Sequence, residues 1–251
     1  NIGLKELIKS SGIEGRKIGT FEVGWILAPR LNASGRLEEA LSSLRLLCTN
    51  SESQAAEISR DLNRVNTERQ ELTRSMVDSA KNSVGENSRP VNVVVNEEFH
   101  EGIIGLIAGK LVSHFGNPAV VIKKGEEFSK ASARSVPGFN IVEFLRALGD
   151  HFENVGGHAG AAGFTIRTEK IDAFLSAVSD HMSDVVLPQP VLEVDAKLTF
   201  EDLSLKTLET VKTLEPFGLG NPEPIFLLEG ATIVNARTVG SQNQHLKLRI
   251  K

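Results

Sequence analysis

The chain has 251 residues, of which 40% are hydrophobic and 24% charged, and its formal net charge is −4. This composition is typical of a globular protein with room for two domains. The acidic balance argues against a protein that coats nucleic acid non-specifically, but it permits a local basic groove. No apolar run is long enough for a membrane span, so we expect a cytoplasmic protein without a membrane partner. Since Asn1 is not a methionine and the sequence begins directly with a segment that predicts a helix, we expect this chain to be a piece of a longer protein.

The first fifty residues predict short helices. One covers residues 4–8, and a second starts near Thr20 and is expected to end where Pro29 disrupts it. The single cysteine, Cys48, follows an apolar run and has no partner for a disulfide, so we expect a small buried side chain.

Two arginines, Arg30 and Arg36, flank a small and turn-forming centre in the segment APRLNASGRL, residues 28–37. The guanidinium group suits bidentate recognition of phosphate or carboxylate, and the glycine beside Arg36 permits a close approach. An equally open alternative is that both arginines are solvated or pair with Glu38 and Glu39.

From Ser51 to Ser83 the chain contains neither proline nor glycine, and its sparse apolar residues recur at spacings of three, four and seven. This pattern predicts a single helix, about 45 Å long, with a narrow apolar stripe and hydrated flanks. Such a helix suits a strut between two lobes better than a core. It is expected to end at Gly85.

After Pro90 the pattern becomes α/β. Expected strands cover residues 91–95, 118–122, 128–134 and 162–166, and expected helices cover residues 101–112, 140–148 and 169–183. This alternation predicts a compact α/β domain of about a hundred residues. Ser132 and Arg134 lie two apart on one expected strand, which puts both side chains on one face of the sheet.

The run GGHAGAAG, from Gly156 to Gly163, is almost free of side chains and contains one imidazole, His158. Backbone N–H groups in such a run form an anion-binding nest, and only His158 adds a side chain that can donate a hydrogen bond. A tight strand entry packed against a neighbouring backbone remains an equal alternative.

Beyond Pro188 the sequence predicts an alternating segment, a helix over residues 203–214 and a rigid irregular loop over residues 215–224. Three further strands follow, over residues 225–228, 231–239 and 245–250. We expect a small antiparallel β unit in which Lys247 and Arg249 share one face.

Four of these motifs occur in an order that resembles the RecJ family of single-strand-specific DNA exonucleases, within the DHH phosphoesterase superfamily. They cover residues 28–37, 132–135, 156–163 and 214–224. The resemblance extends over essentially the whole chain. It implies an α/β architecture in four parts: the C-terminal tail of a DHH catalytic lobe (1–50), a long connecting helix with its linker (51–89), a compact DHH-associated substrate-binding domain (90–186) and an oligonucleotide-binding-fold-like domain (187–251), which we expect to be incomplete.

The resemblance also implies roles for individual residues. His158, with the backbone of Gly156 and Gly157, would contact the scissile phosphate, and Ser132 with Arg134 would hold the 5′-terminal phosphate that sets a 5′ to 3′ polarity. The remaining expected contacts to the strand come from Arg30, Asn32 and Arg36 in the first motif and from Lys247 and Arg249 in the β unit. The implied partners are single-stranded DNA and other DNA repair proteins.

The chain departs from the family in its metal ligands. It contains neither an Asp-x-Asp-x-Gly motif nor an Asp-His-His motif, and its six histidines are scattered. His100, beside Glu101, is expected to cap or pack rather than to bind a metal. The family's manganese or magnesium is therefore expected in the full-length enzyme only, and this chain alone should not hydrolyse DNA. Two alternatives stay open: a non-catalytic nucleic-acid-binding module, or a small-substrate phosphoesterase of the same superfamily.

Overall fold

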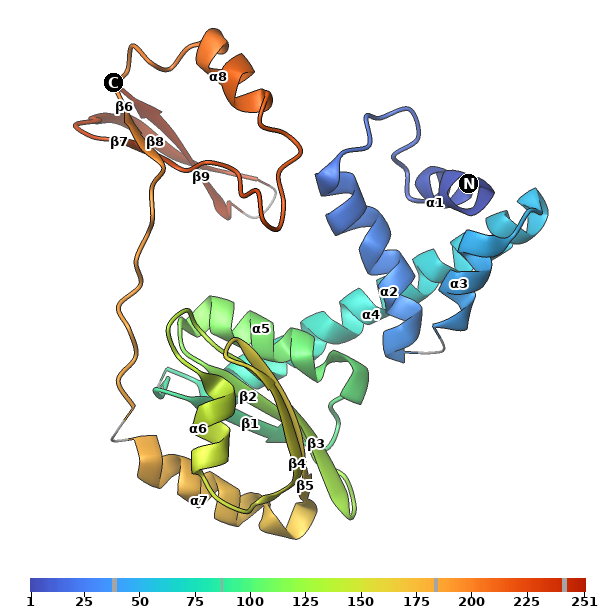
Figure 1. Ribbon diagram of the computed structural model, residues 1–251, viewed down its shortest axis with the longest axis vertical. Helices are drawn as coiled ribbons and strands as arrows, with labels where there is room; N and C mark the ends of the chain where they lie inside the picture. Colours follow the sequence, from blue (N-terminus) through green and yellow to red (C-terminus); the bar gives the residue numbers. More distant parts are fainter. Residues whose placement is uncertain (38–39, 87, 183–184, 241–242) are drawn as a thin grey trace. The chain divides into compact units, whose positions relative to one another are not determined.

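The computed structural model describes residues 1–37, 40–86, 88–182, 185–240 and 243–251. They form two compact units, one of residues 1–17 and 21–190 and the other of residues 18–20 and 191–251 (Figure 1). No helix in these described ranges is long and apolar enough to cross a membrane.

A group of helices opens the first unit: α1 (Ile2–Ser10), the π-helix η1 (Glu22–Leu27), α2 (Ala28–Leu37) and α3 (Leu41–Cys48). The three α-helices pack on the first half of the long helix α4 (Glu52–Val84), around the buried side chains of Leu7, Leu46 and Leu62. The prediction of a buried Cys48 is wrong, because Leu46 occupies the buried face of α3 and leaves Cys48 exposed at its end.

Pro29 does not end a helix, contrary to the prediction. It lies in the first turn of α2, directly after the π-helix, whose last bond joins the Ala28 N–H to the Val23 carbonyl. Proline is tolerated in the first turn of a helix, and the wider π-helical turn relieves the clash of its ring with the preceding turn. The segment around Arg30 and Arg36 is therefore helical rather than a turn.

Helix α4 confirms the predicted long helix. The Ser51 hydroxyl accepts a hydrogen bond from the Gln54 N–H at its start, and Gly85, with a φ of +65°, ends it. Its 33 residues give a rod of about 50 Å. The first half packs on the N-terminal helices, and the second half packs on α5 and β1 in the domain that follows.

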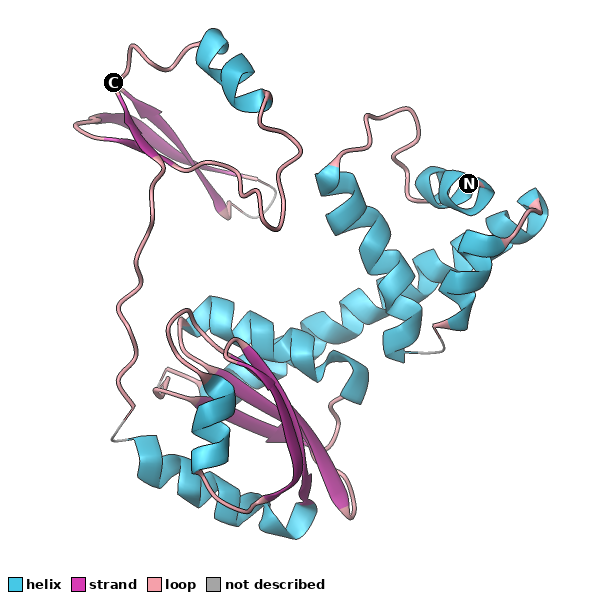
Figure 2. Ribbon diagram, in the orientation of Figure 1, coloured by secondary structure: helices cyan, strands magenta, loops and turns pink. Residues whose placement is uncertain are grey.

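A five-stranded sheet forms the centre of that domain (Figure 2). Its strands are β1 (Asn92–Asn96), β2 (Ala119–Lys123), β3 (Phe128–Arg134), β4 (Phe152–His158) and β5 (Ala161–Arg167), in the order β1-β2-β3-β5-β4. Within this sheet β1 and β2 pair in parallel, and the other three described pairs of neighbouring strands are antiparallel. Strand β4 was not predicted, because its final residues, Gly156, Gly157 and His158, give no strand signal.

Helices cover the two faces of the sheet unequally. Helices α6 (Ile141–Ala147) and α7 (Ile171–His181) pack on one face, around Phe164 and Phe174. Helix α5 (Ile104–Phe115) packs with α4 on the other face, but only over β1, β2 and β3. The 3₁₀ turns Glu101–Ile103 and Thr168–Lys170 lead into α5 and α7. On the α5 side, the described helices leave β5 and β4 uncovered. The last helix of this domain was expected to end at Ser183, which lies outside the described residues.

The described residues of the second unit form two small sheets and one helix. Its elements are β6 (Ala196–Leu198), α8 (Leu205–Lys212), β7 (Phe226–Leu228), β8 (Ile233–Val239) and β9 (His245–Ile250). Strands β8 and β9 are antiparallel as expected, whereas β6 and β7 pair in parallel. The predicted irregular loop is confirmed: the Asn221 amide donates to the carbonyls of Leu214 and Pro216, each at 2.9 Å.

We expect Leu62→Ala to lower the free energy of unfolding by about 2–5 kcal/mol, because Leu62 is fully buried between α4 and the N-terminal helices. Leu44→Ala, on the exposed side of α3, is the matched control and should change stability by less than about 0.5 kcal/mol. Urea unfolding of the two variants tests this, and equal losses would contradict the packing of α4 described above.

Candidate nucleic-acid interface

The open part of the sheet presents three rows of residues across β3, β5 and β4. The register places Arg134, Ala161 and His158 in the first row, Ser132, Gly163 and Gly156 in the second, and Lys130, Thr165 and Asn154 in the third. Because side chains alternate along a strand, all three rows face the same side. The polar residues therefore surround a floor of glycine and alanine.

The glycine-rich run forms the tight connection between β4 and β5. Gly157 has a φ of +146°, and a Cβ there would lie 2.2 Å from the Ala161 carbonyl oxygen, so only glycine fits. The His158 Nδ1 accepts a hydrogen bond from the Gly160 N–H at 3.1 Å. This bond fixes the exposed ring and leaves Nε2 as the nitrogen that can donate to a ligand.

Ser132 and Arg134 lie on one face, as predicted. The Arg134 Nη1 donates to the Ser132 Oγ at 3.1 Å and to the Ala133 carbonyl at 2.8 Å. Burial lowers the pKa of Arg134, and the positive charge of Arg36 lowers it further. Both guanidinium groups remain charged at neutral pH, so the site holds two like charges that repel each other.

Two glycines bring the start of α5 against these cations. A Cβ at Gly105 would lie 2.9 Å from the Arg134 Nη2 and 3.1 Å from the Ser132 Oγ. A Cβ at Gly102 would lie 1.8 Å from the Arg36 carbonyl oxygen. The Arg36 Nη1 in turn donates to the Gly102 carbonyl at 3.2 Å. The end of α2 and the 3₁₀ turn that leads into α5 thus approach so closely that only glycine fits at residue 102.

A third arginine, Arg69 of α4, was not predicted. Burial lowers its pKa, as does the charge of Arg36. Its Nη2 donates to the buried Asn66, and its Nε is buried without a hydrogen-bond partner among the described residues. The sequence does contain a signal: Ala55, Leu62 and Met76 recur on the apolar stripe at multiples of seven, and Arg69 occupies the remaining position of that series.

These three side chains, Arg36, Arg69 and Arg134, are called the arginine cluster below. No carboxylate in the part of the chain that the structure describes forms an ion pair with any of them. Glu38 and Glu39, the alternative partners considered for Arg36, lie outside the described residues. Half-buried cations arranged in this way favour an anionic ligand.

The other predicted residues of the first motif lie elsewhere on α2. Arg30 donates from Nε to the Asn63 side chain and from Nη1 to the Ile26 carbonyl, so it links α2 to α4. Burial lowers its pKa. Asn32 is exposed. Because six residues make less than two full turns of a helix, the side chains of Arg30 and Arg36 point in different directions from the axis of α2.

In the second unit, Lys247 and Arg249 lie on one face of β9, as predicted. The register adds a third cation, Arg237 of β8, directly opposite Lys247. All three are exposed. Like charges that face each other across a strand pair destabilise it, so an anion on this face would be stabilising.

No group of three histidine, cysteine, aspartate or glutamate side chains that could hold a metal occurs within the described ranges. The capping role expected for His100 is confirmed, since its Nδ1 accepts from the Gly102 N–H at 3.1 Å. The described residues therefore do not fit a two-metal site.

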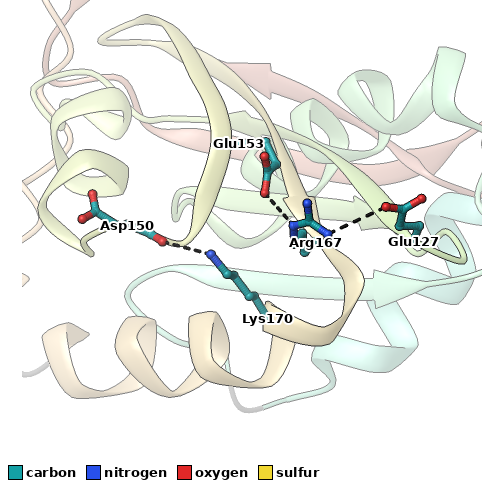
Figure 3. A network of polar contacts seen from close by, with 5 residues as sticks. All are labelled: Glu127, Asp150, Glu153, Arg167 and Lys170. Carbon is teal, nitrogen blue, oxygen red and sulfur yellow. Dashed lines mark hydrogen bonds and ion pairs between the residues drawn. The ribbon is translucent and has the colours of Figure 1, made fainter.

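Carboxylates gather at the far end of the same sheet. Arg167 forms ion pairs with Glu127 and Glu153, and Lys170 donates to the Asp150 carbonyl (Figure 3). Arg134 and Arg167 lie at opposite ends of the paired strands β3 and β5. Arg167 at the far end is thus paired with carboxylates, whereas Arg134 at the other end has no carboxylate partner among the described residues.

Comparisons with known proteins match two domain families in the chain. The DHHA1 domain family matches residues 89–184, and the RecJ OB domain family matches residues 194–251. The single-stranded-DNA-specific exonuclease RecJ of Bacillus subtilis is 35% identical over the whole of this chain, and that of Thermus thermophilus is 32% identical. The chain spans about a third of the length of these two relatives, 33% and 36%.

A solved structure shows the same fold. The crystal structure of RecJ in complex with Mn²⁺ from Thermus thermophilus superposes with a TM-score of 0.87 and 30% sequence identity, and the match covers 99% of this chain and 37% of that one. The same protein has also been solved with Mg²⁺. Helix α4, the sheet and the second unit thus occur together in a larger protein, as its C-terminal part.

We expect Gly102→Ala to lower the free energy of unfolding by about 1–3 kcal/mol, because its methyl group meets the rigid backbone of Arg36. Gly105→Ala is the matched control: its methyl group meets the ends of two side chains, Arg134 and Ser132, rather than backbone, and alanine favours a helix by about 1 kcal/mol over glycine. Thermal and urea unfolding should therefore separate the two variants. Equal stability would contradict the close approach of α2 and α5.

Proposed function

We propose, on the premise that the chain carries a DHHA1 domain followed by the OB domain of the RecJ family, that it binds the 5′-phosphorylated end of single-stranded DNA. In the full-length protein it would form the phosphate-binding wall of an exonuclease cleft whose metal-bearing wall lies elsewhere. The observation that carries this proposal is the convergence of Arg36, Ser132 and Arg134 at the start of α5 without a described carboxylate partner.

The chemistry of these groups suits a terminal phosphate. A 5′-terminal phosphate carries more negative charge than an internal phosphodiester, so a cluster of cations discriminates between them. Arg134 and the Ser132 hydroxyl would hold its oxygens, and Arg36 would approach from α2. The N-terminal end of α5 adds a favourable dipole close to the same point. Together these contacts would fix the 5′ end and hence the direction of digestion, 5′ to 3′.

His158 would bind the next phosphate, the scissile one. Its Nε2 faces away from the bond that holds Nδ1, and the neighbouring backbone at Gly156 and Gly157 has no side chain that blocks access. A hydrogen bond from Nε2 to a phosphate oxygen would orient the phosphodiester and stabilise charge that develops there. The proposed work of this chain in hydrolysis is confined to binding and orientation, because the described residues offer no set of metal ligands.

The second unit would hold nucleotides farther along the strand. Arg237, Lys247 and Arg249 form an exposed basic face on β8 and β9. The whole chain contains twelve phenylalanines, one tryptophan and no tyrosine. Contacts to the backbone, rather than extensive stacking of bases, therefore fit this surface better.

We expect Arg134→Ala to weaken binding of a 5′-phosphorylated single strand by about 1–3 kcal/mol, because it removes a charged contact to the terminal phosphate. Binding of the same strand with a 5′-hydroxyl should change little. Fluorescence anisotropy with both oligonucleotides at one salt concentration measures the difference. Arg146→Ala, an exposed arginine on the opposite side of the sheet, is the control. Equal affinity of Arg134→Ala and the parent protein for the phosphorylated strand would refute the assignment.

We also expect the purified chain alone to lack metal-dependent nuclease activity. Single-stranded DNA labelled at its 3′ end should remain intact in the presence of Mn²⁺ or Mg²⁺, while the same preparation binds the 5′-phosphorylated strand. Binding without hydrolysis would distinguish a phosphate-binding half of a cleft from a complete phosphoesterase. Degradation that co-purifies with the protein and requires the metal would overturn this expectation.

A further inference from the structure

We propose that the open part of the sheet holds the sugar and base of the terminal nucleotide, in a nucleoside pocket next to the arginine cluster. The pocket has a polar wall of Asn154 and Thr165 and a rim formed by the ion pair of Lys130 with Glu101, and the register places Gly156 and Gly163 in the row next to that wall. This inference rests on the proposed function, since the terminal phosphate defines where its nucleoside begins.

A cavity in the structure has the extent that this occupant needs. Its volume is about 410 Å³, within the range of small-molecule sites. Arg36 and Ser132 line it on the side of the proposed phosphate, and Asn154 and Thr165 line it on the other. The third row lies two residues beyond Ser132 along β3, or about 6.8 Å. If the 5′-terminal phosphate binds at Ser132, the sugar attached to it lies over the second row and the base of the same nucleotide lies toward the third row.

The floor is flat because it lacks side chains. A Cβ at Gly156 would meet no atom within 4 Å, and a Cβ at Gly163 would meet only the Ala131 carbonyl, at 3.5 Å. Neither glycine is required by a positive φ. Packing against the described residues and backbone conformation thus leave the absence of these side chains unexplained, whereas a ligand that lies directly on the strands explains it.

The wall and rim favour a nucleoside over a second phosphate. Thr165 and Asn154 are cross-strand neighbours, and their hydroxyl and amide groups both donate and accept hydrogen bonds. Neither side chain bonds to another described residue. The cations beyond the arginine cluster, Lys130 and Arg167, are already paired with carboxylates, so they are less available to a further phosphate than Arg36 and Arg134 are. Groups that both donate and accept hydrogen bonds would tolerate different bases.

The test compares three ligands that share parts of one nucleotide: inorganic phosphate, thymidine and thymidine 5′-monophosphate. Titrations of the ¹⁵N-labelled chain, followed by amide chemical shifts, give the three affinities. We expect the monophosphate to bind about tenfold more tightly than inorganic phosphate, from the added hydrogen bonds and contacts in the pocket. The Gly163→Ala variant should lose this advantage while its affinity for inorganic phosphate is unchanged.

Asn154→Ala combined with Thr165→Val should likewise reduce binding of the monophosphate alone. Gly109→Ala on α5, where an added methyl group also meets nothing within 4 Å, is the matched control and should bind all ligands as the parent does. Thermal unfolding verifies that each variant is folded. Equal affinity of the parent for phosphate and monophosphate, or equal losses of both in the Gly163→Ala variant, would refute the pocket and leave the proposed phosphate site intact. Failure of the parent to bind any phosphorylated ligand would refute the proposed function itself.

Discussion

Electrostatic repulsion within the arginine cluster is the constraint on which the candidate nucleic-acid interface of the first unit depends. Arg36 raises the cost of charge on both Arg69 and Arg134, and each of those two is also partly desolvated. Such an arrangement destabilises the free protein, so the surrounding backbone has to enforce it. Gly102 supplies part of that enforcement, because it lets the turn before α5 meet the end of α2 at a distance that a side chain would prevent, and Gly105 leaves room for Arg134 and Ser132 beside α5.

The elements with strong periodicity or clear capping residues were predictable. The long helix, its end at Gly85, the strand from Phe128 to Arg134 and the helix capped by Asn140 all follow from local signals, and the structure confirms them. The failures share a cause, which is that local sequence does not report tertiary context. A π-helix accommodates Pro29. Pairing with β5 orders the glycine-rich strand β4, which propensity alone disfavours.

The candidate site shows the same limit at the level of single residues. Ser132 and Arg134 could be paired from their spacing on one strand, since alternation is a local property. Arg30 and Arg36 could not be separated, because only the helical path of α2 turns them in different directions and gives Arg30 partners on α4 and η1. Arg69 was missed because it approaches Arg36 from a helix distant in sequence, and Arg237 was missed because the register of β8 against β9 decides which residue faces Lys247.

Helix α4 makes the two hydrophobic cores that it touches thermodynamically dependent on each other. Leu62 belongs to the core of the N-terminal helices, Val77 belongs to the core under α5, and Arg69 lies between them on the same helix. Because no proline or glycine interrupts α4, local opening on one side has no natural stopping point before the other. An anion that relieves the repulsion at Arg69 would stabilise the whole helix by linkage. Amide hydrogen exchange would then slow as far away as Leu7, a residue that no ligand on the sheet could touch.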